Sequence, residues 1–359
     1  MTLKQRLARG GITVTGGEAL PELATPWFVR VLQAFSGWLA ALFLLGFIAV
    51  GALFVLDSEE AAAGLGVVLI ALAFGTLQLA KSDFLEHLAL AVSLVGQLLL
   101  AWAFFSAMGK ETAGLWWALL VLQVLLALGM PSLTHRAFSA FAASVALYLA
   151  LHEGLAAPGL AGGLVLLLLT LLWLNEFCWP DRLRVLEALG LGLLLGLVAI
   201  QAVTYFAEPL LSWRYTEQPG ALAWLEPWAG SVLGALALLL LVRHLLKRHA
   251  GRLAAGVRPA AYGAVLALAL LSLQAHGLLQ GVVVIVLGFA IGHRWLVGGG
   301  VLLLLLASGN YYYWLEVSLL HKALSLFGLG GLLLALRWLL RRHWPVRAVG
   351  CEEDVDQCG

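Results

Sequence analysis

The sequence predicts an all-α protein, a polytopic bundle of transmembrane helices. Of its 359 residues, 62% are hydrophobic and only 11% are charged, and the mean hydropathy is +0.97. A soluble globular domain carries about 25% charged residues, so this chain lacks the polar residues to cover a surface that faces water. Apolar runs of about 20 residues, the length that crosses a bilayer, recur along the whole chain. The net charge of +1 says nothing about nucleic acid, but the chain has no basic domain to bind it, so we expect no nucleic-acid partner.

We expect twelve spans, each with ends accurate to about 2–4 residues. In order they are 28–56, 61–80, 87–108, 114–130, 137–151, 158–175, 185–207, 224–242, 259–276, 278–292, 295–308 and 317–340. Segments 137–151, 278–292 and 295–308 are short for a full crossing. If 278–292 and 295–308 form a re-entrant pair, ten spans remain and the chain still ends on the same side.

The positions of Lys and Arg predict the orientation. With the N-terminus in the cytoplasm, 18 of the 21 Lys and Arg fall on the inner side, and only Lys110, Arg214 and Lys322 fall outside. Cationic loops resist translocation, which produces this bias. We therefore expect both termini in the cytoplasm.

Three regions follow from this topology. Residues 1–26 form a cytoplasmic lead-in without a cleavable signal peptide, residues 27–342 the transmembrane domain, and residues 343–359 a disordered cytoplasmic tail. The tail contains Cys351 and Cys358, which the topology places in a reducing compartment, so we expect no structural disulfide there.

Polar residues are sparse within the spans. An ionisable side chain in a span usually marks an ion or proton path, and we expect none near a span centre. Gln97 and Gln123 lie deepest, and we interpret them as hydrogen-bonding groups between helices. Histidines lie mostly at span ends, where a solvated side chain is usual. A solvated structural cluster is expected at the inner mouth of spans six and seven, from Glu176, Asp181, Arg184 and Glu187.

Two further patterns concern packing and lipid. Glycine pairs four residues apart let helices approach closely, and they occur at Gly192/Gly196, Gly230/Gly234, Gly277/Gly281 and Gly288/Gly292. The longest inner loop, 243–258, is basic. We interpret it as a topology anchor that contacts anionic lipid headgroups. The alternative is that it binds a specific lipid or a partner. Its cations are Arg243, Lys247, Arg248, Arg252 and Arg258.

A candidate site lies on the outer side, at the lip before the last span. We expect an outer polar cluster formed by Glu226, His276, Asn310, Tyr311, Tyr312, Tyr313, Glu316, His321 and Lys322. In it Lys322 pairs with Glu226 or Glu316 around a pocket. The alternative is that Lys322 extends its ammonium outward to water, since it is about one turn inside the boundary.

The two ends of the chain resemble a known family. At the start the matching residues run from Pro26-Trp27-Phe28-Val29-Arg30 to Gly37-Trp38 and on to Phe47, and at the end from Tyr311-Tyr312-Tyr313 to Leu319-Leu320-His321-Lys322. They resemble the bacterial membrane family catalogued as domain of unknown function 4401, with Ala323 where that family has Ser. The resemblance implies a bacterial inner-membrane protein that works with a second polytopic membrane protein and a small periplasmic protein. It implies no established activity, cofactor or catalytic residue.

Three function classes remain open from the sequence. The first is a non-enzymatic subunit of a cell-envelope membrane complex, assembled through the outer aromatic lip. The second is a transporter or channel for a neutral or lipidic substrate. The third, a membrane enzyme, has little support, because no phosphate loop, His-Glu-x-x-His motif or nucleophile elbow occurs. We expect no catalytic residue, metal or cofactor.

Overall fold

The structure is a computed structural model. It describes residues 58–79, 83–108, 112–176, 180–207, 226–248, 256–272 and 277–314, with single positions between 28 and 50 and at 224, 320 and 327. Apart from short turns between helices, these stretches are helical, as the sequence predicts. The elements are α3 (Glu59–Leu79), α4 (Asp83–Met108), α5 (Thr112–Gly129), α6 (Leu133–Leu155), α7 (Gly159–Leu174), η2 (Pro180–Arg182), α8 (Leu183–Ala202), η3 (Val203–Ala207), α10 (Glu226–Arg248), α11 (Val257–Ser272), α12 (Leu278–Ile291) and α13 (Arg294–Trp314).

Length and composition make these helices suited to a bilayer. Five contain stretches long and apolar enough to cross one: Glu59–Leu79, Phe84–Met108, Leu133–Leu155, Leu183–Phe206 and Trp228–Arg248. The remaining apolar stretches, in α5, α7, α11, α12 and α13, are shorter. The fold therefore indicates a multi-pass membrane protein, while twelve spans and their orientation stay predictions.

Two of the three segments predicted to be short belong to longer helices. The fifth expected span, 137–151, belongs to α6, which has 23 residues. Ser132 caps its N-terminus, where the Ser132 side chain accepts a hydrogen bond from the backbone N–H of His135 at 3.3 Å. The expected span 295–308 belongs to α13, which has 21 residues. Both expectations ended where the apolar run ended, but the helices continue through polar residues, such as His135 in α6 and Asn310 in α13.

The third short segment, α12, has only 14 residues. It begins after Gly277 and ends before Gly292, and both glycines have the positive φ that favours Gly, +85° and +80°. At about 1.5 Å per residue α12 is shorter than the hydrocarbon core. It packs against α13, α10, α7 and α11, and these contacts bury one side of it, including Leu279, Val283 and Leu287.

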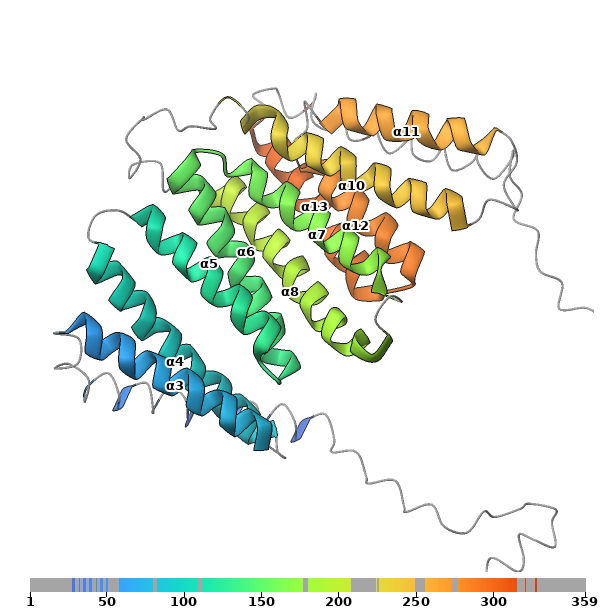
Figure 1. Ribbon diagram of the computed structural model, residues 1–359. Coiled ribbons are helices and arrows are strands. Elements are labelled where there is room, and N and C mark those ends of the chain that lie inside the picture. The colour runs from blue at the N-terminus through green and yellow to red at the C-terminus, as the bar shows by residue number, and fades with distance from the viewer. Residues whose placement is uncertain are drawn as a thin grey trace, which may run out of the picture.

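The helices lie side by side with their long axes running in similar directions (Figure 1). The main neighbours are α3 with α4, α5 with α6, α6 with α8, α7 with α10, and α12 with α13. The α3–α4 pair lies at one edge of the bundle, and α11 lies at the opposite edge beside α10 (Figure 1). The helix ends predicted to face outward, such as the start of α3 and the start of α10, lie at the same end of the bundle (Figure 1).

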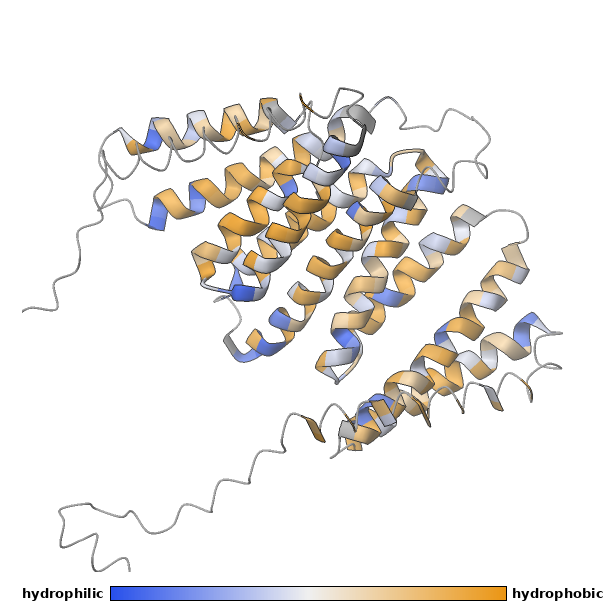
Figure 2. Cartoon of the chain, turned by 180° about the vertical axis from the view of Figure 1, so that it is seen from behind, coloured by the Kyte–Doolittle hydropathy of each residue, from blue (hydrophilic) through white to orange (hydrophobic). Residues whose placement is uncertain are grey.

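The bundle is apolar both inside and on its flanks. Figure 2 shows hydrophobic residues along the bodies of the helices and hydrophilic ones mainly towards their ends. Side chains from α6, α7, α8, α10, α11, α12 and α13 form the largest buried core. Large apolar side chains also face outward, among them Leu125, Leu168 and Phe289 at 63%, 53% and 72% exposure. The described residues of the first expected span are helical, and most of them, including Phe28, are likewise exposed. A surface of this kind suits lipid tails.

Glycines set the closest helix contacts. A Cβ at Gly192 would meet the backbone oxygen of Ala137, and one at Gly196 would meet the Ser144 side chain, so this pair lets α8 lie directly on α6. The prediction for Gly192/Gly196 is therefore confirmed. The pair Gly288/Gly292 is different, because only Gly288 packs closely, against Val297 of α13.

Candidate functional site

The predicted outer polar cluster is described only in part. Glu226 is the first residue of α10, and Asn310 is half-buried near the end of α13. The residues Tyr311, Tyr312 and Tyr313 lie in the last turn of α13 rather than in a lip after it, and Tyr312 is 37% exposed. His276, Glu316, His321 and Lys322 lie outside the described residues. The pairing of Lys322 with a carboxylate stays a prediction.

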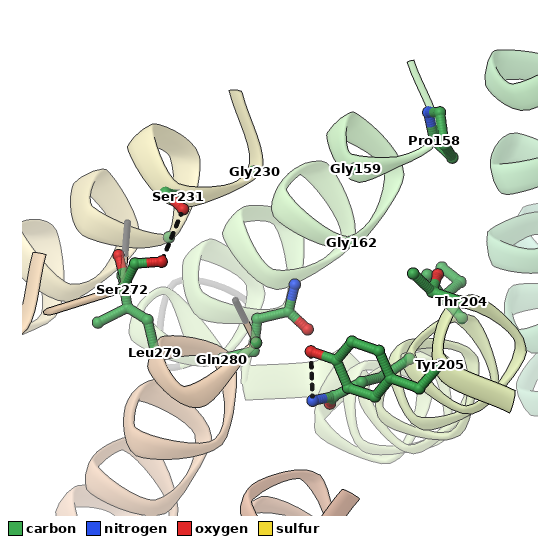
Figure 3. Close-up of a pocket in the computed structure, with 14 residues that line it drawn as sticks. Pro158, Gly159, Gly162, Thr204, Tyr205, Gly230, Ser231, Ser272, Leu279 and Gln280 are labelled. Carbon is green, nitrogen blue, oxygen red and sulfur yellow. Dashed lines mark hydrogen bonds between the residues drawn. The ribbon is translucent and has the colours of Figure 1, made fainter. Parts of the chain in front are cut away.

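A cavity of about 180 Å³ lies at the predicted outer end of the bundle, between α7, α8, η3, α10, α11 and α12. We call it the outer cavity. Its polar lining consists of neutral side chains, drawn as sticks in Figure 3: Gln201, Thr204, Tyr205, Ser231, Ser272 and Gln280. Glycines and a few apolar residues complete the wall. None of the lining residues carries a formal charge at neutral pH.

Gln201 is the most constrained of these polar groups. Its side chain is 3% exposed. Its amide nitrogen donates to the backbone oxygen of Leu303 at 3.2 Å and to the Tyr205 hydroxyl at 3.4 Å. Because the Leu303 carbonyl can only accept a hydrogen bond, the Gln201 amide must turn its NH₂ group, and not its oxygen, towards Leu303. The amide oxygen of Gln201 then has no hydrogen-bond partner among the described residues.

Glycines make room for the polar side chains of the outer cavity. A Cβ on Gly162 would lie 2.7 Å from the amide nitrogen of Gln280. A Cβ on Gly277 would collide with the Tyr205 hydroxyl, and one on Gly230 would lie 2.8 Å from the backbone oxygen of Gly159. Larger residues here would push the side chains of Gln280 and Tyr205 aside or force α7 and α10 apart.

The backbone changes from α to π geometry beside the outer cavity. η3, Val203–Ala207, is a π-helical segment that continues α8, and it contributes Thr204 and Tyr205 to the wall. Single π turns inside helices occur frequently at functional sites. Here the extra residue in the turn directs two hydroxyl-bearing side chains to one cavity.

A second polar feature is a chain of hydrogen bonds inside the helices α4, α5 and α6, which we call the buried polar chain. The amide of Gln123 donates to the Gln97 oxygen at 2.7 Å, and the Gln97 amide donates to the Ser93 hydroxyl at 3.1 Å. Ser93 and the Nε2 of His135 are hydrogen-bonded at 2.8 Å, and the Nδ1 of His135 lies 3.2 Å from the Ser139 hydroxyl. All five side chains are buried.

The buried polar chain confirms one prediction and corrects another. Gln97 and Gln123 join α4 to α5, as expected for hydrogen-bonding groups between spans. The sequence predicts a solvated side chain for a histidine near a span end, but His135 is 0% exposed. The Ser132 cap puts His135 in the first turn of α6, on the face that meets α4.

A third group lies at the predicted inner end. His293 pairs with Glu187 at 3.4 Å, and its ring is 5.0 Å from that of Trp173. Glu176 is 9% exposed, so the expectation of a fully solvated cluster is wrong for this residue. Burial raises the pKa of Glu176, while the nearby His293 and Arg248 act in the opposite direction.

The basic residues proposed to contact lipid headgroups lie at the same end. Arg243, Lys247 and Arg248 are exposed on the last turns of α10, and Arg258 is exposed at the start of α11. Arg252 is outside the described residues. Their contact with lipid stays a prediction. Within the described stretches, no three His, Cys, Asp or Glu side chains lie close enough together to hold a metal ion.

Helices of this length and hydropathy, packed around an apolar core, indicate a multi-pass helical membrane protein. More particularly, the chain belongs to the family described as domain of unknown function 4401, which matches residues 26–343. The resemblance inferred from the two ends of the sequence is thereby confirmed. No curated protein and no solved structure matches the chain.

The outer cavity was not predicted from the sequence. Two signals were present: glutamines inside the expected spans, at Gln201 and Gln280, and glycines at the outer ends of others, at Gly162, Gly230 and Gly277. Neither signal says that these residues meet, because the cavity joins segments far apart in the sequence.

Proposed function

We propose that this protein is a non-enzymatic subunit of a cell-envelope membrane complex, located in the inner membrane of a bacterium. Both termini face the cytoplasm, and the outer end of the bundle meets the partners. By the family resemblance these are a second polytopic membrane protein and a small periplasmic protein. The non-enzymatic part of the proposal rests on the sequence, which contains no nucleophile or metal-binding motif.

One observation carries the proposal, the filled interior of the bundle. Eight apolar side chains in its middle are 0% exposed: Leu166, Leu169, Leu197, Leu241, Val283, Val284, Leu287 and Leu303. A transport path needs polar groups or a water-filled space across the membrane, because an unpaired polar solute is costly in an apolar medium. A close-packed apolar centre favours a structural or binding role over a conduit.

The distribution of charge supports the orientation. Arg243, Lys247, Arg248 and Arg258 are exposed at one end of the bundle, and Arg294 is exposed at the start of α13, whose predicted place is the same side. An excess of Lys and Arg on one side of a membrane protein is typical of its cytoplasmic face.

Site-specific cross-linking tests the subunit proposal. A photoreactive phenylalanine analogue replaces Tyr312, at the outer end of α13, in cells that express the full chain. The matched control replaces Trp295, which is at the other end of the same helix and 75% exposed. We expect protein adducts of defined mass from position 312 and only lipid adducts from position 295. Adducts of lipid alone at both positions would remove the support for an outer partner.

A second candidate function is a carrier for a small neutral solute, and the outer cavity favours it. Flux distinguishes the two functions. Purified protein in liposomes should show no uptake of a labelled polyol above protein-free liposomes, with or without a proton or sodium gradient. Reproducible protein-dependent uptake would replace the subunit proposal with the carrier.

A further inference from the structure

We propose that the outer cavity binds a compact, uncharged group that bears hydroxyls, supplied either by a free polyol or by the headgroup of a neutral lipid. The proposal concerns binding at this site and does not depend on whether the chain acts as a subunit or as a carrier. It rests on three properties of the wall: an unpaired acceptor, neutral polar side chains and space cleared by glycines.

The unpaired acceptor is the amide oxygen of Gln201. Both bonds from its nitrogen hold the side chain in place, one to Leu303 on α13 and one to Tyr205 on η3. Buried polar atoms almost always find a partner, and one left without costs stability. The oxygen belongs to a residue that lines the cavity but is itself closed off, so a ligand hydroxyl in the cavity would satisfy it once the neighbouring wall side chains shift to admit it.

The remaining polar wall suits hydroxyls. Thr204, Ser231 and Gln280 are half-buried and line the same space; Figure 3 shows the Gln280 amide between Gly162 and Tyr205. Hydroxyl and amide groups can each donate and accept, and a ligand hydroxyl does the same, so several pairings are available. The described wall offers no charged partner, and an ionic ligand would lose its hydration without compensation.

The size of the cavity limits the ligand. A volume of about 180 Å³ is somewhat larger than the cavity of about 150 Å³ that accepts benzene in an engineered protein. A six-membered ring with hydroxyl substituents fits this scale. The outer cavity also lies at the ends of helices, the predicted level of lipid headgroups, so a sugar on a neutral lipid reaches it as readily as a free polyol does.

Binding is measured on the full chain in phosphatidylcholine nanodiscs. Radiolabelled myo-inositol is the free-polyol probe, followed by equilibrium dialysis. For the lipid source, monoglucosyl-diacylglycerol is added to the nanodiscs, and the lipids retained after purification are identified by native mass spectrometry. Excess phosphatidylglycerol serves as the anionic competitor in both arms.

Two variants connect binding to the site. Gln201→Leu removes the acceptor and should weaken binding about tenfold, the loss of one good buried hydrogen bond. Its matched control is Gln123→Leu, which removes another buried amide with an unpaired oxygen, but in the buried polar chain. Gly162→Ala pushes the flexible Gln280 amide into the cavity and should weaken binding several-fold. Its control, Gly298→Ala, meets nothing within 4 Å.

The outcomes are distinct. Retention of myo-inositol that falls in Gln201→Leu and Gly162→Ala but not in the controls supports a free polyol. Retention of the glucolipid with the same pattern supports a lipid headgroup. If the wild-type chain retains neither probe, or if the two cavity variants bind as well as their controls, the proposal is overturned. A flux assay on the same samples tests the carrier separately.

Discussion

At the scale of single residues, the buried polar chain shows how neutral side chains are accommodated inside an apolar bundle. Each of Gln123, Gln97 and Ser93 contacts the next polar group at 3.1 Å or less. Within a bilayer no water can replace such a partner. These bonds therefore orient α4, α5 and α6 relative to one another, rather than providing a path for ions.

From the buried polar chain we predict that substituting its two glutamines lowers the free energy of unfolding by unequal amounts. Gln97→Leu removes the partner of the Gln123 amide and one of the two partners of Ser93, whereas Gln123→Leu affects only Gln97. We expect losses in the free energy of unfolding of about 1–2 kcal/mol for Gln97→Leu and about 0.5–1 kcal/mol for Gln123→Leu. Thermal or SDS unfolding of the purified variants measures both.

The double variant is the internal control. Because the two amides share one bond, the combined loss should be smaller than the sum of the single losses. Strict additivity, or a larger loss from Gln123→Leu than from Gln97→Leu, would contradict this account of the buried polar chain.

Sequence reasoning reached some of these residues and missed others for a physical reason. Gln97 and Gln123 stand out because an amide in a span needs a partner. His135 was missed because the apolar run begins after it, although Pro131 and Ser132 mark a helix start earlier. Gln201 was missed because its importance depends on Tyr205, Leu303 and a cavity between helices, which hydropathy alone does not encode.

At the scale of helices, glycine controls how closely pairs pack. Gly192 and Gly196 face α6. Gly66 of α3 and Gly96 of α4 face each other, and a Cβ added to either would lie within 2.8 Å of the backbone oxygen of the other. Spacing predicted the first pair. It did not distinguish Gly292, which ends α12 with a positive φ and has open space around it. Glycine spacing thus suggests contacts, and only the partner helix decides which of them form.

Substitution at this interface should be costly. Gly192→Ala places a Cβ against the Ala137 carbonyl, a backbone group that cannot move without shifting α6. We expect a loss of roughly 1–3 kcal/mol in the free energy of unfolding. Gly75→Ala on α3 is the matched control, since a Cβ there meets nothing within 4 Å, and it should be neutral or slightly stabilising. Equal unfolding midpoints for the two variants would argue against close α6–α8 packing.

At the scale of the whole molecule, the described helices form one bundle with two chemically different ends. The predicted outer end holds the outer cavity with its neutral polar wall. The predicted inner end holds Glu187, His293 and the exposed basic residues of α10. Composition was enough to predict an all-α membrane bundle, and ten of the twelve expected segments correspond to α3–α8 and α10–α13. Which helices are neighbours required the structure, because contacts such as α7 with α10 join distant segments.

The central claim is that the chain crosses the membrane repeatedly, with the outer cavity on the outer face. Cysteine accessibility tests it most directly. In a background with Cys178, Cys351 and Cys358 changed to Ser, single cysteines replace Glu59, at the start of α3, and Pro131, between α5 and α6; both positions are exposed. Intact cells are treated with a membrane-impermeant maleimide, and permeabilised cells show that each site can react. We predict labelling of Glu59→Cys in intact cells and of Pro131→Cys only after permeabilisation; labelling of Pro131→Cys in intact cells would contradict the account.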